Sequence, residues 1–376
     1  MVIRLLTILA LSQVQAPAPS LPQTVLKNFA TWDLNRDGKL TQTEIDSNLL
    51  NPNFHDTDAA ALAAMHVWMS STSDPLPDLD RAWFMNYKPV RFTIAKGTSR
   101  DEAKKARKAY AGTPGSLQST FTASLKRLNR KGDNVLFDAD GPNLPDIRQG
   151  ALGDCYMLAP LGALVHRNPD DVRNMVKPEG NGFRVKFGDG QEVKVNALTD
   201  GELALGGSST KAGYWIRIVE KAYGSRKLSE GDEKVATDSM RGGSSGTAGK
   251  AFTGNKFSSV SLIGDFKKEV SQEKLDEKMK QLRTEIPKAT ADKRLIVAGT
   301  SKKDMPKSIS PNHAYAIFGY DAKTDRITIW NPHGNDFKPK GDEGPENGYL
   351  IEDGVFSMPL QMFVKTFSRI MFESKN

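Results

Sequence analysis

The sequence predicts an α+β protein in which a small helical module precedes a larger domain with a helical part and an antiparallel β-sheet part. Apolar residues follow helical spacing in segments before residue 70, and again at residues 155–165 and 214–223. Short strand patterns gather after residue 290. The length of 376 residues implies two or three domains at about 150 residues per domain.

Composition excludes several classes of protein. With 38% hydrophobic residues, the chain is too rich in core-forming residues to be wholly disordered. The single cysteine, Cys155, excludes an intrachain disulfide framework and a cysteine-rich zinc site. A formal net charge of +7 is mild for a dedicated nucleic-acid binder, so no nucleic-acid partner is expected. No apolar run approaches the roughly 18 residues of a transmembrane segment, and the oligomeric state is not indicated.

Residues 1–18 are expected to be a secretory signal peptide. Arg4 precedes the apolar stretch 5–11, and small residues follow it, which is the order found in such signals. Pro17 and Pro19 suit the cleavage site poorly, so the alternative is an amphipathic helix that stays on the protein. We expect a secreted or cell-envelope protein with the signal, and a cytoplasmic one if the segment is retained.

The first chemical motif is the loop 33–44, which reads DLNRDGKLTQTE, within a helical module expected over residues 19–75. Oxygen ligands at alternate positions let so short a loop fold around Ca²⁺, and Gly38 allows the sharp turn. All required positions match the EF-hand pattern, and helices are expected on both sides. Residues 74–80 are too rich in proline to predict a partner loop. The predicted calcium ligands are Asp33, Asn35, Asp37, the Lys39 carbonyl, Thr41 through water, and Glu44.

Residues 76–130 are expected to be a basic linker region. Positions 95–131 contain ten Lys and Arg residues and only two acidic residues, Asp101 and Glu102. Lys105 and its neighbouring cations share one expected helix. Such a charge run is usually a solvated face or a linker, which is the interpretation favoured here over contact with nucleic acid or an anionic membrane.

The remaining chain mixes helices and strands. Residues 183–195 are expected to form a hairpin with an Asp-Gly turn, and the Gly/Ser/Thr-rich segment 242–254 is expected to be a boundary or a mobile loop. Ser271 is placed to cap a helix that runs to about residue 285. Further strands are expected at residues 294–298, 313–320 and 326–330.

Cys155 stands at the expected start of the helix 155–165, after glycines that suit a tight loop. A sulfur at a helix N-terminus is expected to favour the thiolate, because the helix dipole and free N–H groups favour negative charge there. Most free cysteines are small buried hydrophobes, and Cys155 by itself does not exclude that interpretation.

His313 and Asn331 strengthen the case for catalysis. His313 opens the strand 313–320, and Asn331 follows the strand 326–330. If these strands form a hairpin centred near residue 322 or 323, His313 lies opposite residue 331 or 333. Residues 331 and 333 are two positions apart and so point to the same face of the strand. In either register His313 and Asn331 therefore lie on one face, about 5 to 8 Å apart. An imidazole oriented by an amide is the general base and acid that a thiolate nucleophile needs.

These motifs resemble those of the calpain family of papain-like cysteine proteases. Residues 149–158, QGALGDCYML, resemble the family's active-site motif, 310–315, SPNHAY, its histidine motif, and 330–334, WNPHG, its asparagine motif. The resemblance extends over roughly residues 130–375. It also includes WIRIVEKAY at 215–223, FTG at 252–254 and DGVF at 353–356.

The resemblance implies a papain-like fold of two subdomains, residues 131–254 with the cysteine and residues 255–376 with the histidine and asparagine. Cys155 would be the nucleophile, and His313 the base that then protonates the leaving amine. Asn331 would orient His313, and the Gln149 side chain would help hold the oxyanion, which is typically worth a few kcal/mol of barrier.

The chain departs from the family pattern at several positions. Tyr156 and His333 both stand where tryptophan is usual, and Pro160 removes a backbone donor early in the catalytic helix. Calpain cores also bind calcium. Here Asp146 and Asp353 match, but Gly213 and Val355 stand where ligand carboxylates are expected. Calcium sites in the protease core are therefore not supported, and the N-terminal EF-hand is the better candidate.

We predict a cysteine endopeptidase that hydrolyses protein or peptide substrates through a Cys155 thiolate and an acyl-enzyme, with possible control by Ca²⁺. The alternative is a calcium-binding interaction protein with an inactive calpain-like domain, which the intact catalytic residues argue against. A serine nucleophile in the Gly-x-Ser-x-Gly segment 242–246 lacks the required preceding strand. A third alternative is a transglutaminase-like acyltransferase, but such enzymes usually orient the histidine with an aspartate, and residue 331 is asparagine.

Overall fold

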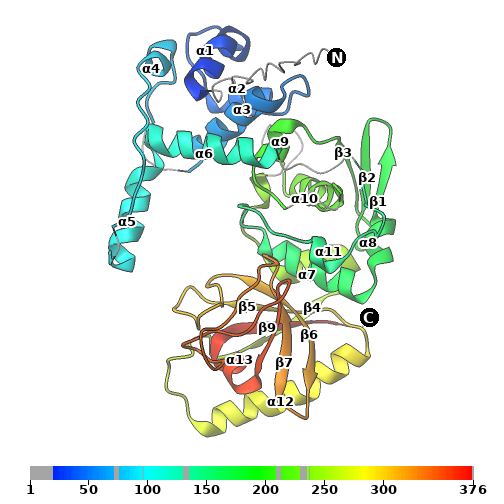
Figure 1. The fold of residues 1–376 in the computed structure, drawn as a ribbon. Helices are drawn as coiled ribbons and strands as arrows, with labels where there is room; N and C mark the ends of the chain where they lie inside the picture. The colour runs from blue at the N-terminus through cyan, green and yellow to red at the C-terminus, as the bar shows by residue number, and fades with distance from the viewer. Residues whose placement is uncertain are drawn as a thin grey trace, which may run out of the picture.

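The computed structural model describes residues 20–71, 76–95, 97–129, 135–208, 213–228, 235–236 and 238–374. The expected signal peptide, residues 1–18, lies outside them and stays a prediction. Figure 1 shows three tiers, with a helical N-terminal unit above a middle tier of helices and a small sheet, and a larger antiparallel sheet below. The combination of helical parts and an antiparallel sheet confirms the predicted α+β class.

The N-terminal unit begins with four helices, α1 (Leu21–Trp32), α2 (Gln42–Leu49), α3 (Asp56–Met69) and α4 (Arg81–Met85). Ser20 caps α1 by accepting a hydrogen bond from the Gln23 N–H. Thr41 and Glu44 form a reciprocal capping box that starts α2 immediately after the predicted calcium loop. Helix α3 lies in the region of helical spacing expected before residue 70, and its alanine-rich surface is buried by the helices around it.

Helix α6 corrects the expected linker. After the exposed, cationic α5 (Arg100–Ala111), α6 (Pro114–Leu128) packs along α3 with Leu117 and Phe121 fully buried. Its apolar residues recur at helical spacing, so the helix buries one face while Lys126 on the other face stays in water. Residues 114–128 therefore belong to the packed helical unit, whereas α5 has the solvated character expected of the region.

The middle tier is built around α7 (Cys155–Arg167), whose apolar side chains lie at the centre of one core. It is surrounded by α8 (Pro169–Met175), α10 (Trp215–Ser225) and α11 (Ser245–Thr253). The short helix α9 (Asp200–Ala204) joins this tier to the N-terminal unit. The predicted hairpin is part of a three-stranded antiparallel sheet of β1 (Val176–Glu179), β2 (Gly182–Lys186) and β3 (Glu192–Asn196).

Helix α11 corrects the mobile loop expected over residues 242–254. Ala248, Ala251 and Phe252 are buried in the middle core, so burial stabilises a helix in spite of its glycine and serine content. Gly254 ends it in the left-handed region at φ +78°, where glycine carries no steric penalty. The chain then enters the large sheet.

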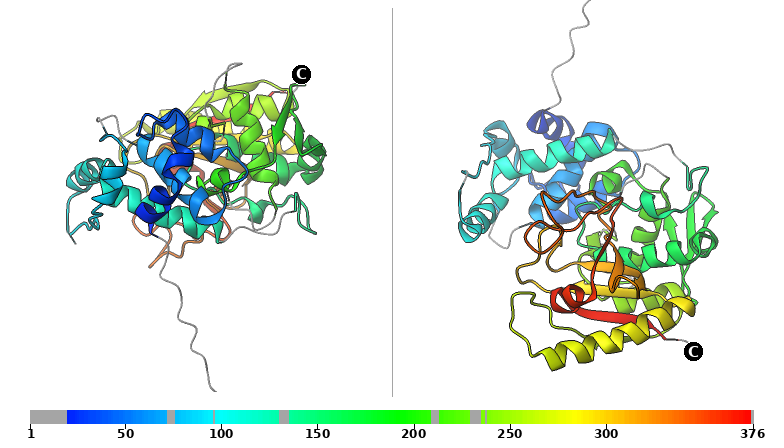
Figure 2. Two further views of the ribbon diagram at one scale, coloured as in Figure 1. Left: turned by 90° about the horizontal axis from the view of Figure 1, so that it is seen from above. Right: turned by 60° about the horizontal axis from the view of Figure 1, so that its bottom comes forward.

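The large sheet has six antiparallel strands in the order β4-β9-β5-β6-β7-β8. Helices α12 (Gln272–Ala291) and α13 (Leu360–Thr366) cover one face, and α7 packs on the other (Figures 1 and 2). The strands are β4 (Phe257–Ser261), β5 (Ile296–Thr300), β6 (Ala314–Asp321), β7 (Arg326–Trp330), β8 (Val355–Pro359) and β9 (Phe367–Glu373). Within the described residues, we find no helix long and apolar enough to cross a membrane.

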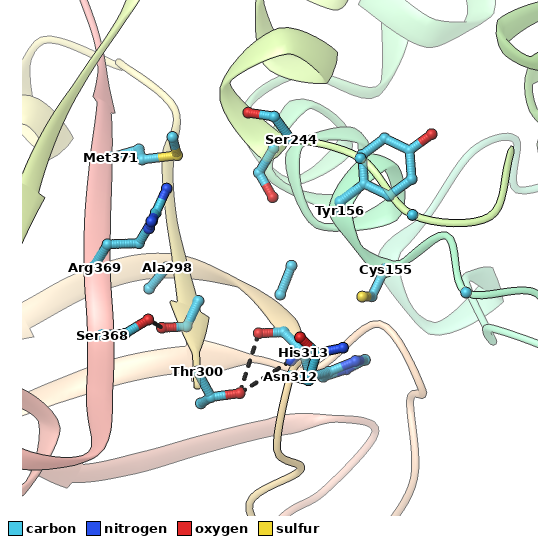
Figure 3. A pocket seen from close by; sticks show the side chains of 16 residues that line it. Cys155, Tyr156, Ser244, Ala298, Thr300, Asn312, His313, Ser368, Arg369 and Met371 are labelled. Atoms are coloured by element: carbon cyan, nitrogen blue, oxygen red, sulfur yellow. Dashed lines mark hydrogen bonds between the residues drawn. The ribbon is translucent and has the colours of Figure 1, made fainter. Parts of the chain in front are cut away.

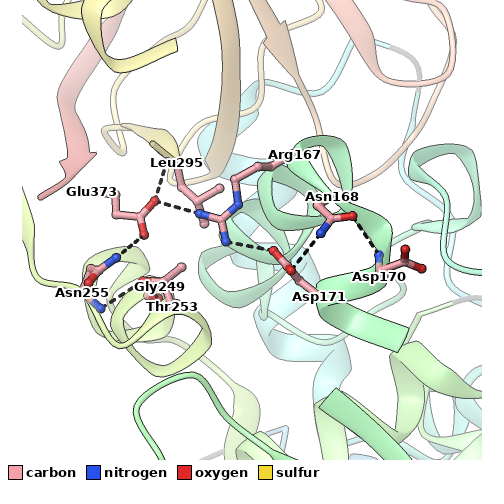
Figure 4. A network of polar contacts seen from close by, with 9 residues as sticks. All are labelled: Arg167, Asn168, Asp170, Asp171, Gly249, Thr253, Asn255, Leu295 and Glu373. Atoms are coloured by element: carbon pink, nitrogen blue, oxygen red, sulfur yellow. Dashed lines mark hydrogen bonds and ion pairs between the residues drawn. The ribbon is translucent and has the colours of Figure 1, made fainter. Parts of the chain in front are cut away.

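Two contacts fix α7 against the sheet. Gly162 lies against the Trp330 ring so closely that a Cβ there would overlap it, which explains the glycine in this helix. At the end of α7 remote from Cys155, Arg167 forms an ion pair of 3.2 Å with the buried Glu373 of β9 (Figure 4). Glu373 also accepts hydrogen bonds from the Leu295 N–H and the Asn255 amide. The subdomains are thus joined at one end of α7, and a cleft opens at the other.

Candidate active site

A cleft of about 430 Å³ lies where the N-terminus of α7 faces the large sheet (Figure 3). Cys155 and Tyr156 from α7 form one wall with the segment 242–245 that leads into α11. The opposite wall comes from β5, from the start of β6 with His313, and from β9 with Arg369 and Met371. The structure therefore brings Cys155 and His313, 158 positions apart in the sequence, to opposite walls of one cleft.

Cys155 follows a tight loop that is held by backbone contacts. The N–H groups of Ala151 and Leu152 both donate to the Gly206 carbonyl, at 2.5 and 3.3 Å. A Cβ at residue 150 would overlap the carbonyls of Gly206 and Gly207, so the close approach requires Gly150. The loop therefore delivers the sulfur to the first residue of α7, as the sequence predicted.

The sequence led us to expect a thiolate at Cys155, but the site favours the protonated thiol. Burial raises the pKa of Cys155 above its ordinary value, and the nearby Asp154 raises it further. Hydrogen bonds from the backbone N–H groups of Ala314 and of Cys155 and Tyr156 oppose this, but they do not outweigh burial. The helix N-terminus therefore stabilises the thiolate as predicted, but desolvation is the larger effect and the net shift of the Cys155 pKa is upward.

His313 and Asn331 are held together as predicted. His313 Nε2 lies 2.8 Å from Asn331 Oδ1, and both residues are buried. The backbone N–H of His333 donates to the same Oδ1 at 3.1 Å, so this atom acts as an acceptor and Nε2 must carry the proton. In the neutral ring, the other nitrogen, Nδ1, then keeps its lone pair and is ready to accept a proton.

The electrostatics of His313 favour that neutral form. Burial and the neighbouring His333 lower its pKa to about 4, in spite of the hydrogen bond to Asn331. The His333 ring is stacked on the His313 ring at a centroid distance of 4.5 Å and an angle of 3°. The stack limits access of water to the imidazole from that side.

The register of the β6–β7 hairpin contains a feature that the sequence did not reveal. Near the turn, Asp321 pairs with Arg326, which is an odd offset. A bulge between Ile317 and Gly319 shifts the register, and Ala316 then pairs with Trp330 at an even offset. The predicted even offset therefore holds at the site end of the hairpin, where it places His313 beside Asn331.

Gln149 is next to the site through its backbone contact with Pro332, but it is not among the described residues that line the cleft. Its side-chain Nε2 donates to the Leu152 carbonyl at 2.9 Å, and its own N–H donates to the Pro332 carbonyl at 2.8 Å. Its Oε1 is buried without a hydrogen-bond partner among the described residues. The amide expected to hold the oxyanion is thus engaged within its own loop in this structure.

A buried cluster beneath Cys155 was missed by the sequence interpretation. The fully buried Asp154 lies beside Glu220, and burial together with this second carboxylate raises the pKa of Asp154 well above its usual range. Glu220 pairs with Arg217 at 2.9 Å and accepts the Ser208 N–H at 3.0 Å. The motifs at 149–158 and 215–223 contain all three charged residues, but only the fold places them together.

The predicted calcium loop has the turn geometry that its sequence requires. Gly38 adopts φ +83°, and Asp33 accepts hydrogen bonds from the N–H groups of Asp37 and Gly38 at 3.1 and 2.9 Å. Glu44 accepts from the N–H groups of Asn35 and Thr41, at 3.1 and 2.9 Å. Burial alone would raise the pKa of Glu44, but these hydrogen bonds outweigh it and the pKa is lowered. The closing carboxylate is therefore ionised.

The loop has a partner segment, contrary to the prediction. Leu40 N–H donates to the Leu79 carbonyl at 3.0 Å, and Lys39 and Asp80 form an antiparallel bridge. Trp83 stands four residues after Leu79, where Glu44 stands four residues after Leu40. The second segment therefore lacks the closing carboxylate. It supports the first loop through backbone pairing, which its prolines did not prevent because Leu79 and Asp80 lie beyond them.

The described residues hold no cluster of three or more His, Cys, Asp or Glu side chains that converges as a preformed metal site. Between the middle tier and the large sheet, Asp353 is instead paired with Arg148 at 2.5 Å. Burial and the nearby Asp138 raise the pKa of Asp146 to about 6, and Gly213 offers no carboxylate.

Comparison with known families decides the identity of this domain. The profile described as "Calpain family cysteine protease" matches residues 112–372. The chain belongs to the calpain family of cysteine proteases. The match begins at α6, so the calpain-like region extends further toward the N-terminus than the predicted boundary at residue 131.

Curated relatives agree with this assignment. Residues of this chain are 28% identical to the calpain-1 catalytic subunit of Gallus gallus over 65% of this chain and 37% of that protein. The calpain-1 catalytic subunits of Macaca fascicularis and Mus musculus are 31% and 25% identical, over 36% and 67% of this chain and 20% and 38% of those proteins. The chain therefore spans between about a fifth and two fifths of the length of these calpains.

Proposed function

We propose that the calpain domain is an active cysteine endopeptidase that hydrolyses peptide bonds of protein substrates. One observation carries the proposal: Asn331 Oδ1 fixes the His313 ring with its lone pair on Nδ1, in a cleft that it shares with the only cysteine of the chain. A structural role would not require a buried neutral imidazole on the wall opposite the sulfur.

The chemistry follows from these groups. His313 Nδ1 takes the Cys155 proton as the sulfur attacks the scissile carbonyl, and the new bond forms a tetrahedral intermediate. The imidazolium then gives the proton to the leaving amine, which leaves an acyl-enzyme on the sulfur. Water, deprotonated by His313, attacks the thioester and releases the acid. Asn331 holds the ring in position throughout. Gln149 would assist the oxyanion after its amide leaves the Leu152 carbonyl.

The pKa directions predict how the free thiol reacts. With the pKa of Cys155 raised and that of His313 lowered to about 4, the pair is thiol and neutral imidazole at neutral pH. Alkylation by iodoacetamide should therefore rise about tenfold per pH unit between pH 6 and 8, because only the thiolate reacts. The rate is measured by quenching the labelling reaction at a series of times and quantifying the alkylated chain by mass spectrometry. A rate that is flat between pH 5 and 8 would show a preformed thiolate–imidazolium pair and contradict the account.

We propose further that the loop 33–44 binds Ca²⁺ as an EF-hand. Five oxygen-bearing side chains and the Lys39 carbonyl are the donors that calcium prefers, and Glu44 is ionised. The hydrogen bonds that now satisfy Asp33 and Glu44 come from backbone groups of the same loop and, for Glu44, also from the Thr41 hydroxyl. A bound ion would add ligation by these carboxylates without unfolding the flanking helices. Pairing with Leu79 would support the loop from its other side.

A continuous path supports the proposal that this calcium regulates the peptidase. Thr199, the cap of α9, donates to the Leu49 carbonyl at the end of α2. At the other end of α9, the Ala204 carbonyl accepts Arg127 at 3.0 Å, and two residues later Gly206 holds the loop of Gln149 and Cys155. A shift of α2 on calcium binding would therefore move α9. It would also bear on the loop that now keeps Gln149 away from the cleft.

Glu44→Gln should weaken calcium binding by about tenfold or more, because one ionised ligand is lost from the loop. Isothermal titration calorimetry measures the binding, and casein hydrolysis over the same calcium range shows whether the rate follows it. Glu277→Gln, an exposed residue of α12, is the matched control and should bind as the wild type does. Unchanged calorimetry for Glu44→Gln would place the calcium elsewhere. Unchanged calcium dependence of hydrolysis would refute the regulatory path.

A further inference from the structure

The cleft carries a positive charge that the proposed catalytic chemistry does not use. Among the described residues that line it, Arg369 is the only one with a formal charge, since the neutral form of His313 predominates. Figure 3 shows Arg369 beside Met371 on the β9 wall, across the cleft from Ser244 and Tyr156. Its position in the cleft makes it a candidate contact for substrate.

Arg369 differs from the other arginines of the large-sheet part of the chain. Arg283 pairs with Asp325 at 2.8 Å, Arg326 with Glu343 at 2.7 Å, and Arg294 with Asp292 at 3.5 Å. Among the described residues, Arg369 has no carboxylate within ion-pair distance, and it is exposed. Water solvates an exposed guanidinium, so an arginine at the surface needs no carboxylate partner for stability. The guanidinium is therefore available to a ligand.

The strand register explains why this side chain lies over the catalytic wall. Arg369 on β9 is directly opposite Gly299 on β5, and Met371 is opposite Val297. Because Gly299 has no side chain, the Arg369 stem crosses it, and the Cγ lies 3.8 Å from where a Cβ would stand. The same point lies 3.8 Å from the His313 carbonyl. The Arg369 stem and the His313 carbonyl therefore both lie beside Gly299.

The lining beside Arg369 defines the chemistry that fits. Ala298, Ala314 and Met371 provide apolar surface, while the guanidinium stands at the edge of it. A glutamate side chain matches this combination, because its methylenes can lie on the apolar wall while its carboxylate meets the fork of N–H donors. A neutral amide of the same shape keeps the packing but loses the charge-assisted hydrogen bonds.

Resting on the proposed peptidase function, we propose that Arg369 is a specificity-determining residue that selects substrates with an acidic side chain close to the scissile bond. The pair stays in contact with solvent, so its effect is moderate. We expect kcat/KM for a glutamate peptide to exceed that for its glutamine counterpart by about five- to twentyfold at low salt. The preference should shrink as ionic strength rises.

The test uses the full chain and peptide sets that carry Glu, Gln or Lys at each of several positions on both sides of the cleaved bond. Wild type is compared with Arg369→Gln and Arg369→Glu. Lys323→Glu, at the far end of the β6–β7 hairpin, makes the same change of net charge outside the cleft and serves as the control. Ratios of kcat/KM are compared, so any general loss of activity cancels.

The inference expects a Glu-over-Gln preference at one position for wild type and Lys323→Glu. The Glu-to-Gln ratio of kcat/KM should fall to about one in Arg369→Gln. In Arg369→Glu the lysine peptide should instead be preferred over the glutamine peptide, by about the same factor. A wild-type ratio near one at every position, or a preference that survives in Arg369→Gln, would overturn it. Binding of the same peptides to Cys155→Ser by fluorescence anisotropy separates the two proposals. A Glu preference in binding without hydrolysis by wild type would support Arg369 and refute the peptidase.

Discussion

Cys155→Ser is expected to reduce casein hydrolysis by at least about 10³-fold, which is the largest effect the account predicts. A serine hydroxyl in this position meets a histidine whose pKa is lowered to about 4, which makes His313 a weak base toward so poor an acid. The substitution is nearly isosteric, so the fold should persist. Hydrolysis of fluorescein-labelled casein measures the loss, and circular dichroism with a thermal melt verifies the fold.

The same variant should lose covalent labelling by a peptidyl epoxide, since Cys155 is the only thiol in the chain. Hydrolysis by Cys155→Ser within tenfold of wild type would show that another group performs the chemistry. Ser244 also lines the cleft, but it precedes α11 and follows a 3₁₀ turn at Asp238–Met240. The strand that a serine nucleophile elbow requires is therefore absent from the described residues before it.

His313→Ala should be nearly as severe, with a loss of at least about 10³-fold in kcat, because both proton transfers depend on the imidazole. His333→Ala is the matched control within the same ring stack. His333 contacts Asn331 through its backbone N–H, which alanine retains, so the orientation of His313 should survive. We expect His333→Ala to remain within about tenfold of wild type, since no proton transfer is lost. Steady-state kinetics on one peptide substrate compare the two variants.

The reverse result, with His333 essential and His313 dispensable, would mean that the stack was assigned in the wrong order. Both residues lie close enough for this outcome to be informative, at a centroid distance of 4.5 Å. Severe loss in both variants would contradict the claim that the His333 side chain takes no part in proton transfer. It would show that the stack itself takes part in the reaction.

The sequence was sufficient for the features that depend on local pattern. Helical spacing indicated the helices before residue 70, and the alternating oxygen residues identified the loop 33–44. The catalytic pair was predictable because the assumed hairpin centre, near residue 322 or 323, matches the register at the site end of the hairpin. However, the bulge near Phe318 was invisible. A prediction from the turn register alone would have had odd parity, because Asp321 pairs with Arg326.

Other features depend on tertiary contacts and lay beyond the sequence. Residues 245–253 have poor helix formers, but burial of Phe252 in the middle core stabilises α11. The helix N-terminus suggested a thiolate at Cys155, but desolvation could be assessed only after the walls of the cleft were in place. The pairing of Leu40 with Leu79 likewise required the fold, because the second segment lacks a calcium signature.

Active-site titration tests the central claim most directly, that Cys155 and His313 act together across one cleft. The purified chain is treated with increasing amounts of a peptidyl epoxide, and residual casein hydrolysis is plotted against label found on Cys155 by peptide mapping. The account predicts a straight line that reaches zero hydrolysis at one label per molecule. Full hydrolysis by chain whose Cys155 is quantitatively labelled would contradict it.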